Sequence, residues 1–327
     1  MSIQLFVMEL IRSSFFIWLL FCAHLSFAQN NKADFKVIPL GVLGGGDESN
    51  LSAYMIAPEN SNHYACLDAG TVRFGIQQAI HDNLFKQSVA TVLRTNIKGY
   101  LISHPHLDHV AGLIINSPDD TAKNIYALPF CIDVLKGNYF TWKSWSNFAN
   151  EGEKPTLNKY RYIALDTAKE TGIDNTELFV RPFLLSHSNP NQSTAFLVRY
   201  KEAYILYLGD TGADEIEKTD HLSLLWQHIA PLIKAKRLKA IFIETSFPDE
   251  QPVKQLFGHL TPSLLMKEMD ALGGLAGKEN LSHLSIVITH IKPIKGDSQE
   301  IIKKELQQLN SLKLKLVFPQ QARELDL

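Results

Sequence analysis

The sequence has few cysteines, no block of like charge and no apolar run of bilayer length, and each absence excludes a class of protein. Only 3 of the 327 residues are cysteine, which excludes a small scaffold held together by disulfides. The formal net charge is -2, and lysine and arginine do not cluster as a partner for a nucleic-acid polymer would need. With 45% hydrophobic and 20% charged residues, the composition is that of an ordinary globular protein with a large core.

The N-terminus has the pattern of a secretory signal peptide over residues 1–28. Arg12 precedes the apolar run 15–23, and Ser26 and Ala28 place small residues at the −3 and −1 positions of a cleavage site. This apolar run is shorter than the ~20 residues that span a bilayer, which disfavours the alternative of an uncleaved anchor. A lipid-modified cysteine at position 22 is disfavoured by the large residue before it. We therefore expect cleavage after residue 28, a periplasmic location and no stable membrane anchor.

Cleavage there would leave Cys66 and Cys131 in the mature chain. They could pair in an oxidising compartment, but two cysteines do not make a disulfide framework. Neither has the spacing of a metal ligand to another cysteine. We expect core residues, with a disulfide as the alternative.

Short apolar runs typical of strands recur along the chain, with helical patterns between some of them. The strand-like runs are 35–42, 51–57, 64–67, 99–103, 178–185, 195–200, 203–208, 238–244 and 284–289. The helical patterns are 72–85, 221–236, 262–272 and 298–309. This order favours an α/β sandwich in which helices cover sheets. Without a linker, we expect a single catalytic domain over 29–327, with the irregular segment 137–177 as an insertion beside the site.

The densest group of metal-binding side chains is the run HPHLDH at residues 104–109, which follows an apolar strand ending at Ser103. Imidazoles buried without partners cost free energy, so packing explains this density poorly. Histidine and aspartate are nitrogen and oxygen donors that zinc accepts. The run predicts a metal site, and a histidine-rich surface turn is the alternative.

In type and spacing the run resembles the H-x-H-x-D-H motif of the metallo-β-lactamase superfamily. The resemblance implies an αββα sandwich of two mixed sheets flanked by helices, with two divalent metal ions. Zinc is the first choice, although Mn²⁺ or Fe²⁺ could use the same donors. It further implies that His104, His106 and His187 hold one ion, that Asp108, His109 and His290 hold the other, and that Asp210 bridges them. Because such ligands must be deprotonated, activity should fall in acid.

Several further segments are similar to the class II cyclic-nucleotide phosphodiesterases: 44–52, 209–212, 243–247, 258–262 and 289–293, with Leu107 and Gly112 in the metal run. The resemblance implies hydrolysis of a 3′,5′-cyclic nucleotide, cyclic AMP before cyclic GMP, to the 5′-monophosphate by metal-bound hydroxide. Asp108 and Asp210 would then be catalytic as well as ligands. His259 is the candidate proton donor to the leaving 3′-oxygen, with Glu244 fixing its ring and raising its pKa. The alternative is a structural pair in a loop.

The substrate's base and the partners are less constrained. The aromatic segment 139–145 could stack on a purine, or could be local core or an oligomer contact such as that of a homodimer. Gly44 to Gly46 could leave backbone room near the metals. Two alternative hypotheses for the function are another hydrolase of this fold, such as a β-lactamase, thioester hydrolase or nuclease, and a binding protein without catalytic activity.

Overall fold

The computed structural model describes residues 33–293 and 296–327. The first of its two sheets has seven strands in the order β14-β1-β2-β3-β4-β5-β6. The pairs from β14 to β3 are antiparallel and those from β3 to β6 are parallel. Its strands are β1 (Phe35–Gly41), β2 (Ala53–Pro58), β3 (Tyr64–Leu67), β4 (Ile97–Leu101), β5 (Lys123–Ala127), β6 (Tyr160–Ala164) and β14 (Leu325–Asp326).

The second sheet also has seven strands, in the order β13-β12-β11-β10-β9-β8-β7. The pairs from β10 to β13 are parallel and those from β7 to β10 are antiparallel, so this sheet is mixed like the first. Its strands are β7 (Thr171–Gly172), β8 (Phe179–Ser186), β9 (Gln192–Tyr200), β10 (Ala203–Leu208), β11 (Leu238–Glu244), β12 (Ser285–Thr289) and β13 (Lys315–Val317).

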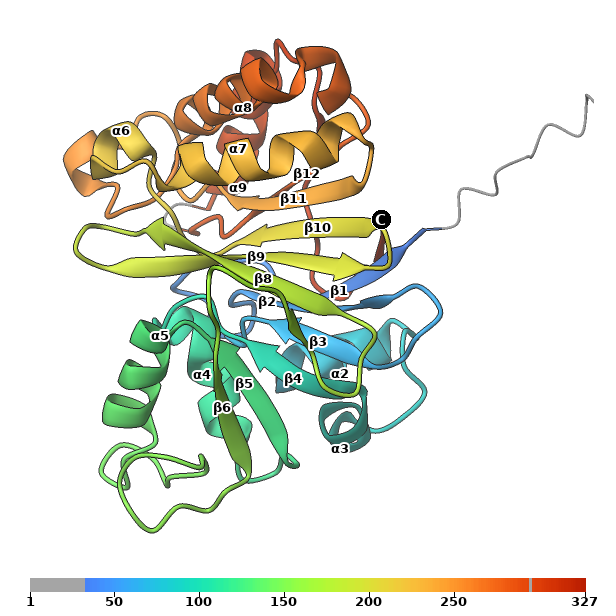
Figure 1. The fold of residues 1–327 in the computed structure, drawn as a ribbon, viewed down its shortest axis with the longest axis vertical. Helices are drawn as coiled ribbons and strands as arrows, with labels where there is room; N and C mark the ends of the chain where they lie inside the picture. Colours follow the sequence, from blue (N-terminus) through green and yellow to red (C-terminus); the bar gives the residue numbers. More distant parts are fainter. Residues whose placement is uncertain (1–32, 294–295) are drawn as a thin grey trace, which may run out of the picture. The chain divides into compact units, whose positions relative to one another are not determined.

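Helices cover the outer face of each sheet within the unit Asp34–Leu327, as Figure 1 shows. On the first sheet lie α2 (Arg73–His81), α4 (Leu107–Asn116) and α5 (Pro129–Val134). On the second lie α7 (His221–Lys234), α8 (Pro262–Ala276) and α9 (Ser298–Leu309). Shorter helical segments are α3 (Val89–Thr91), α6 (Asp214–Glu217), η1 (Val92–Asn96), η2 (Leu135–Tyr139), η3 (Val253–Gln255) and η4 (Lys278–Leu281). The predicted αββα arrangement of two mixed sheets is confirmed.

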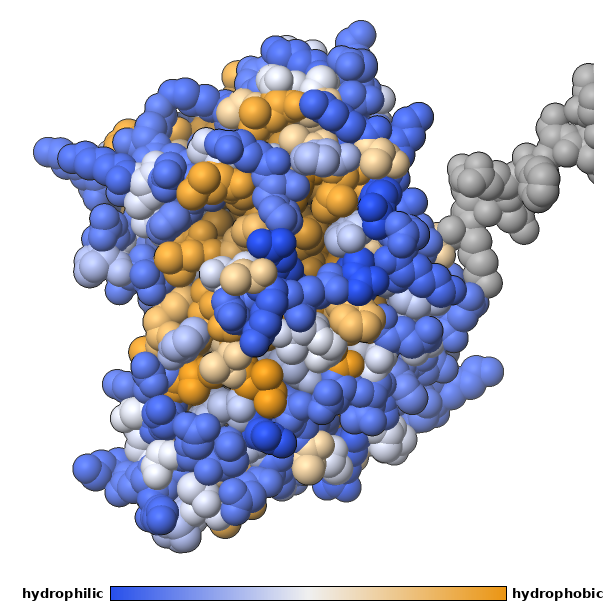
Figure 2. Space-filling model, in the orientation of Figure 1, coloured by the Kyte–Doolittle hydropathy of each residue, from blue (hydrophilic) through white to orange (hydrophobic). Residues whose placement is uncertain are grey.

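The strands alternate their side chains between two apolar layers, because successive residues of a strand point to opposite faces. In β11, Ala240 and Phe242 pack between the sheets, whereas Ile241 and Ile243 pack against the helices. Strands buried on both faces read as continuous apolar runs, which is why most of them could be recognised in the sequence. Figure 2 shows hydrophilic residues over much of the helical layers, with hydrophobic residues gathered between them.

Four elements that position or support the site were not predicted: α4, α5, β5 and β6. Helix α4 begins within the metal run at Leu107, directly after Pro105 and His106. β5 and β6 contain Lys123, Asn124 and Arg161 among their apolar residues, and these polar residues obscured the strand pattern.

The segment 137–177, predicted as an insertion, contributes an edge strand to each sheet. Residues 140–159 are loop, β6 pairs with β5, and β7 pairs with β8. The predicted signal peptide, residues 1–28, lies outside the described residues. Among the helices within 33–293 and 296–327, none is long and apolar enough to cross a membrane.

Candidate active site

The structure brings all seven predicted metal ligands together at the carboxyl ends of strands. They come from the loop after β4, the first turn of α4 and the ends of β8, β10 and β12: His104, His106, Asp108, His109, His187, Asp210 and His290. Both sheets contribute, so the site depends on the packing of the whole sandwich.

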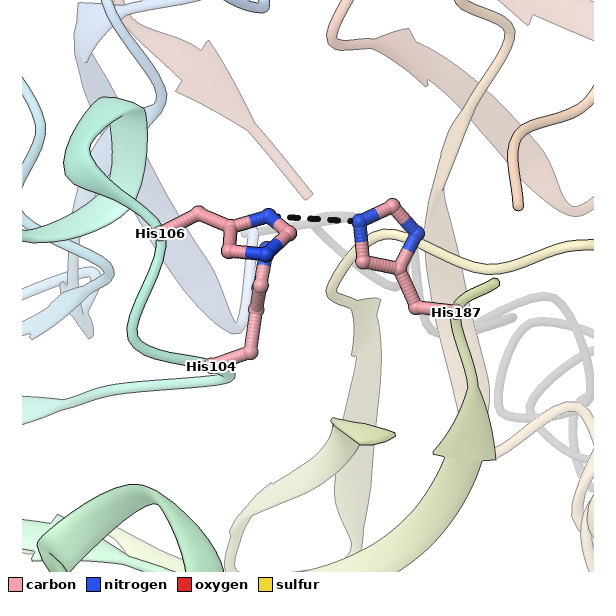
Figure 3. Close-up of side chains that lie close together, drawn as sticks. All are labelled: His104, His106 and His187. Atoms are coloured by element: carbon pink, nitrogen blue, oxygen red, sulfur yellow. Dashed lines mark hydrogen bonds between the residues drawn. The ribbon is translucent and has the colours of Figure 1, made fainter. Parts of the chain in front are cut away.

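The first group is formed by three histidines. One ring nitrogen from each of His104, His106 and His187 lies within 4.8 Å of the others. Nδ1 of His106 and Nε2 of His187 are 3.3 Å apart, as the dashed line in Figure 3 shows. Three imidazole nitrogens at these distances suit a tetrahedral cation with one position open, which is the arrangement of catalytic zinc sites.

The second group consists of Asp108, His109, Asp210 and His290, whose ligand atoms also lie within 4.8 Å of one another. Asp210 reaches both groups. Its Oδ2 is 3.7 Å from Nε2 of His104 and 3.2 Å from Nε2 of His290. A carboxylate placed in this way can be shared by two cations.

Hydrogen bonds to the far nitrogens orient three of the rings. Nδ1 of His187 donates to the carbonyl of Gly258 at 2.9 Å, and Nδ1 of His109 to Oδ2 of Asp68 at 2.8 Å. Nδ1 of His290 donates to Oγ of Ser246 at 3.0 Å. Such bonds fix the tautomer and leave each Nε2 as a lone pair facing the group.

Two observations test whether these residues fit metal ions. Nε2 of His104 is buried and has no hydrogen-bond partner among the described residues. The Nε2 atoms of His109 and His290 lie 3.1 Å apart, although the Nδ1 proton of each ring is donated to another residue, Asp68 or Ser246. Two nitrogen lone pairs at that distance repel unless a proton or a metal cation lies against them. A metal ion held by both rings removes the repulsion, so the residues present fit the metals that the fold implies.

The directions in which the pKa values of the ligands are shifted agree with this fit. Burial is the main cause that lowers the pKa of His104, His106 and His187. Burial opposes the charged form of Asp210, but the neighbouring imidazoles of His290 and His109 outweigh it and hold the pKa of Asp210 well below its usual range. Neutral imidazoles and ionised carboxylates are the forms that coordinate a divalent cation.

His109 differs from the other rings. Burial alone would lower its pKa, but the carboxylates of Asp210, Asp68 and Asp108 together raise the pKa of His109 well above its ordinary value. This part of the pocket therefore favours a positive charge.

Glu244 and His259 form a buried pair beside these ligands. Nδ1 of His259 lies 2.7 Å from Oε1 of Glu244, and Oγ of Ser246 donates to Oε2 of Glu244 at 2.5 Å. Burial raises the pKa of Glu244 to about 7, and Asp210 acts in the same direction. Burial lowers the pKa of His259 to about 4. The pKa of His259 is therefore lowered and not raised as predicted, because desolvation of the ring outweighs the nearby carboxylates of Asp210 and Asp108.

Asp68 is a residue of the site that the sequence analysis missed. Asp68 is fully buried, and its backbone has a φ of 54°. Its carboxylate accepts hydrogen bonds from the backbone N–H and the hydroxyl of Ser103, from the hydroxyl of Tyr207 and from Nδ1 of His109. It directly follows β3, as the ligands follow other strands. A polar residue at the end of an apolar strand was the signal that could have identified it.

Two glycines permit close approach of loops to the ligands. A Cβ on Gly44 would lie 2.2 Å from Cε1 of His290, so the early glycine run does leave room at the site. Gly258 has a φ of +78°, and a Cβ there would lie 2.1 Å from the backbone nitrogen of Ser188. Glycine is needed at both positions because any side chain would displace a ligand-bearing segment.

The aromatic segment 139–145 divides between core and surface. Phe140 is buried, whereas Trp142 and Trp145 are partly exposed, with indole N–H groups held by Pro155 and Ser117. The hydroxyl of Tyr139 donates to the carbonyl of Pro105 at 2.8 Å, between the first two ligands. The segment thus supports the metal-binding loop.

Cys66 and Cys131 are both free and fully buried, so the prediction of core residues is confirmed and the alternative of a disulfide is not. Burial is the main cause that raises the pKa of both thiols, which keeps them unreactive.

Comparison of the coordinates with solved structures defines the class of protein. The yeast phosphodiesterase PDE1, unliganded, superposes with a TM-score of 0.80 at 23% identity, covering 90% of this chain and 100% of that one. The metallo-β-lactamase fold protein YhfI from Bacillus subtilis superposes with a TM-score of 0.57 at 15% identity, over 89% of this chain and 99% of that one. The chain has the metallo-β-lactamase fold.

The sequence then places the chain within that class. Residues 31–317 match the family described as cAMP phosphodiesterases class-II. A 3′,5′-cyclic-nucleotide phosphodiesterase from Aliivibrio fischeri is 42% identical over 89% of this chain and 92% of its own length. A probable 3′,5′-cyclic-nucleotide phosphodiesterase from Yersinia pestis is 37% identical over 90% of each chain. The chain therefore belongs to the class II cyclic AMP phosphodiesterase family, and as such it is an enzyme that hydrolyses 3′,5′-cyclic nucleotides.

Proposed function

We propose that this enzyme acts on cyclic AMP, converts it to adenosine 5′-monophosphate, and does so with two divalent ions held by the seven ligands. The family's description names cyclic AMP, which supports the choice of base. The observation that carries the two-ion proposal is the position of Asp210, whose carboxylate lies between the two ligand groups.

Zinc is the proposed ion in both positions, because five imidazole nitrogens and two carboxylates suit its preferences. When bound, a pair of divalent ions lowers the pKa of a water molecule and offsets charge on phosphoryl oxygens. His104, His106 and His187 would hold one ion, and Asp108, His109 and His290 the other, with Asp210 shared.

The protein's own contribution to bond breaking is the proposed transfer of a proton to the leaving 3′-oxygen. With a proton on Glu244, its Oε1 donates to Nδ1 of His259, and the single proton of the neutral ring is on Nε2. As the P–O3′ bond breaks, Nε2 gives its proton to the oxygen and Nδ1 takes the proton of Glu244. The ring ends neutral and Glu244 ends as a carboxylate. Ser246 holds the second carboxylate oxygen in place throughout.

A substrate panel tests the proposal. The purified protein is incubated with cyclic AMP, cyclic GMP, bis(4-nitrophenyl) phosphate and a chromogenic cephalosporin, and products are separated. We expect the highest kcat/KM with cyclic AMP and adenosine 5′-monophosphate as its sole product. Faster turnover of the cephalosporin, or formation of the 3′-monophosphate, would contradict the proposal.

We also propose that residues 1–28 direct export to the periplasm and are removed. The support is the sequence pattern alone: Arg12, the apolar run 15–23 and the small residues before position 29. N-terminal sequencing of the protein recovered from a periplasmic extract should begin at Gln29. Recovery of the full-length chain from the cytoplasm would contradict it.

A further inference from the structure

Lys292 lies beside the metal ligands but belongs to neither group. It follows His290 by two residues, and its backbone N–H donates to the carbonyl of Ser246 at 3.1 Å, which fixes the position of its main chain. Its side chain is partly buried.

The amine of Lys292 reaches back over the early glycine loop. A Cβ built on Gly45 would lie 3.9 Å from Nζ of Lys292 and also 3.9 Å from Oδ2 of Asp108. The backbone N–H of Gly45 donates to that same carboxylate oxygen at 3.0 Å. The ammonium group of Lys292 and the carboxylate of Asp108, a ligand of the second metal position, thus both border the space that a side chain at position 45 would fill.

This ammonium group forms no ion pair with any carboxylate in the described part of the chain, not even with Asp108. Its Nζ lies 5.8 Å from the centroid of the Phe247 ring. The ring of Phe247 in turn packs edge-on against that of His259, with 5.6 Å between centroids. The ring of Phe247 therefore lies near both the amine of Lys292, which is beside the second metal position, and the ring of the proposed proton donor.

A partly buried cation without an anionic partner is unfavourable unless an anion binds there. The phosphodiester of a cyclic nucleotide carries one negative charge on its non-bridging oxygens, and lysine is a common point-charge partner for phosphate. We propose that Lys292 binds a non-bridging phosphoryl oxygen of the substrate, and of the phosphate group of the product, and so orients the phosphorus toward the metal positions. This inference rests on the proposed function and assigns the residue that recognises the phosphate.

The test compares Lys292→Met, Lys292→Arg and the control Lys86→Met, whose lysine is exposed in the loop after α2. Each metal-loaded protein is titrated calorimetrically with inorganic phosphate, and the binding of uncharged adenosine is measured in parallel. Because one charge-assisted hydrogen bond is lost, we expect about a tenfold or greater weakening of phosphate binding in Lys292→Met. Lys292→Arg should retain most of the affinity, and adenosine binding, metal content and Tm should match the wild type in all three variants.

Two results would overturn the proposal. One is phosphate binding in Lys292→Met equal to that of the wild type at equal metal content. The other is loss of metal from Lys292→Met with recovery in Lys292→Arg, which would make the lysine a structural partner of Asp108. Failure of the wild type to hydrolyse cyclic AMP would instead overturn the proposed function, while the phosphate titration would still decide the position of Lys292.

Discussion

Nδ1 of His259 lies 2.7 Å from Oε1 of Glu244, and both side chains are almost fully buried next to the ligand groups. Burial penalises the charged form of each, which raises the pKa of Glu244 and lowers that of His259. A single proton can therefore be held by the pair near neutral pH. In the proposed mechanism, proton donation and metal binding use different side chains, so the two can be tested independently.

Replacing His259 should slow the reaction according to the leaving group. In His259→Ala we expect kcat for cyclic AMP to fall about 100-fold or more, because its alkoxide leaving group needs a proton. Turnover of bis(4-nitrophenyl) phosphate, whose leaving group is stable as an anion, should fall far less. Steady-state kinetics with both substrates measure the difference. His81→Ala, in which an exposed imidazole is removed, is the control. An equal loss for both substrates would exclude His259 as the proton donor.

The pH dependence of kcat should follow the proton on the pair. Because the pKa of Glu244 is raised to about 7, its proton is present below that pH and is lost as pH rises through it. We expect kcat for cyclic AMP to decline above about pH 7, and the decline to be absent for bis(4-nitrophenyl) phosphate. In Glu244→Gln, kcat for cyclic AMP should be lower but should lose this decline. Identical alkaline profiles for the two substrates in the wild type would contradict the prediction.

Ser246 should affect metal binding through His290. Its hydroxyl accepts from Nδ1 of His290 and donates to Glu244, so it orients both a ligand and the carboxylate of the pair. Loss of such a supporting bond commonly costs roughly 10- to 100-fold in metal affinity, and we expect that loss for the second ion in Ser246→Ala. Competition with a chelator measures it. Ser246→Thr should recover much of the affinity, and the exposed Ser282→Ala should change nothing. Unchanged affinity in Ser246→Ala would show that the bond has no effect on the ligand.

Asp210→Asn tests whether one carboxylate serves two ions. The amide keeps the shape but removes the charge that faces both groups, so we expect bound metal to fall from two equivalents to one or fewer and turnover to fall almost to background. Elemental analysis and cyclic AMP assays measure the two effects. Asp133→Asn, at an exposed position, is the matched control. Retention of two equivalents would contradict the shared position.

The sequence predicted the parts of this structure that depend on local pattern. Strands such as β11 are buried on both faces and therefore appear as apolar runs. The H-x-H-x-D-H run and the polar residues after β8, β10 and β12 could be read in the same way, and the structure brings them together.

What the sequence did not reveal depends on contacts between distant segments. Asp68 contacts His109 and Tyr207, which lie 41 and 139 residues away in the chain. The direction of the shift in the pKa of His259 depends on burial, which no local pattern reports. The role proposed for Lys292 depends on the position of its amine beside Gly45 and on the lack of a carboxylate partner within 33–293 and 296–327, and neither can be deduced from the sequence.

The most direct test of the two-ion account is a metal titration of the apoprotein with activity as the readout. The protein is stripped with a chelator, and Zn²⁺ is added in steps while hydrolysis of cyclic AMP to adenosine 5′-monophosphate is measured. We predict that activity rises to its maximum at two equivalents per chain. Full activity at one equivalent, or none at two, would contradict the account.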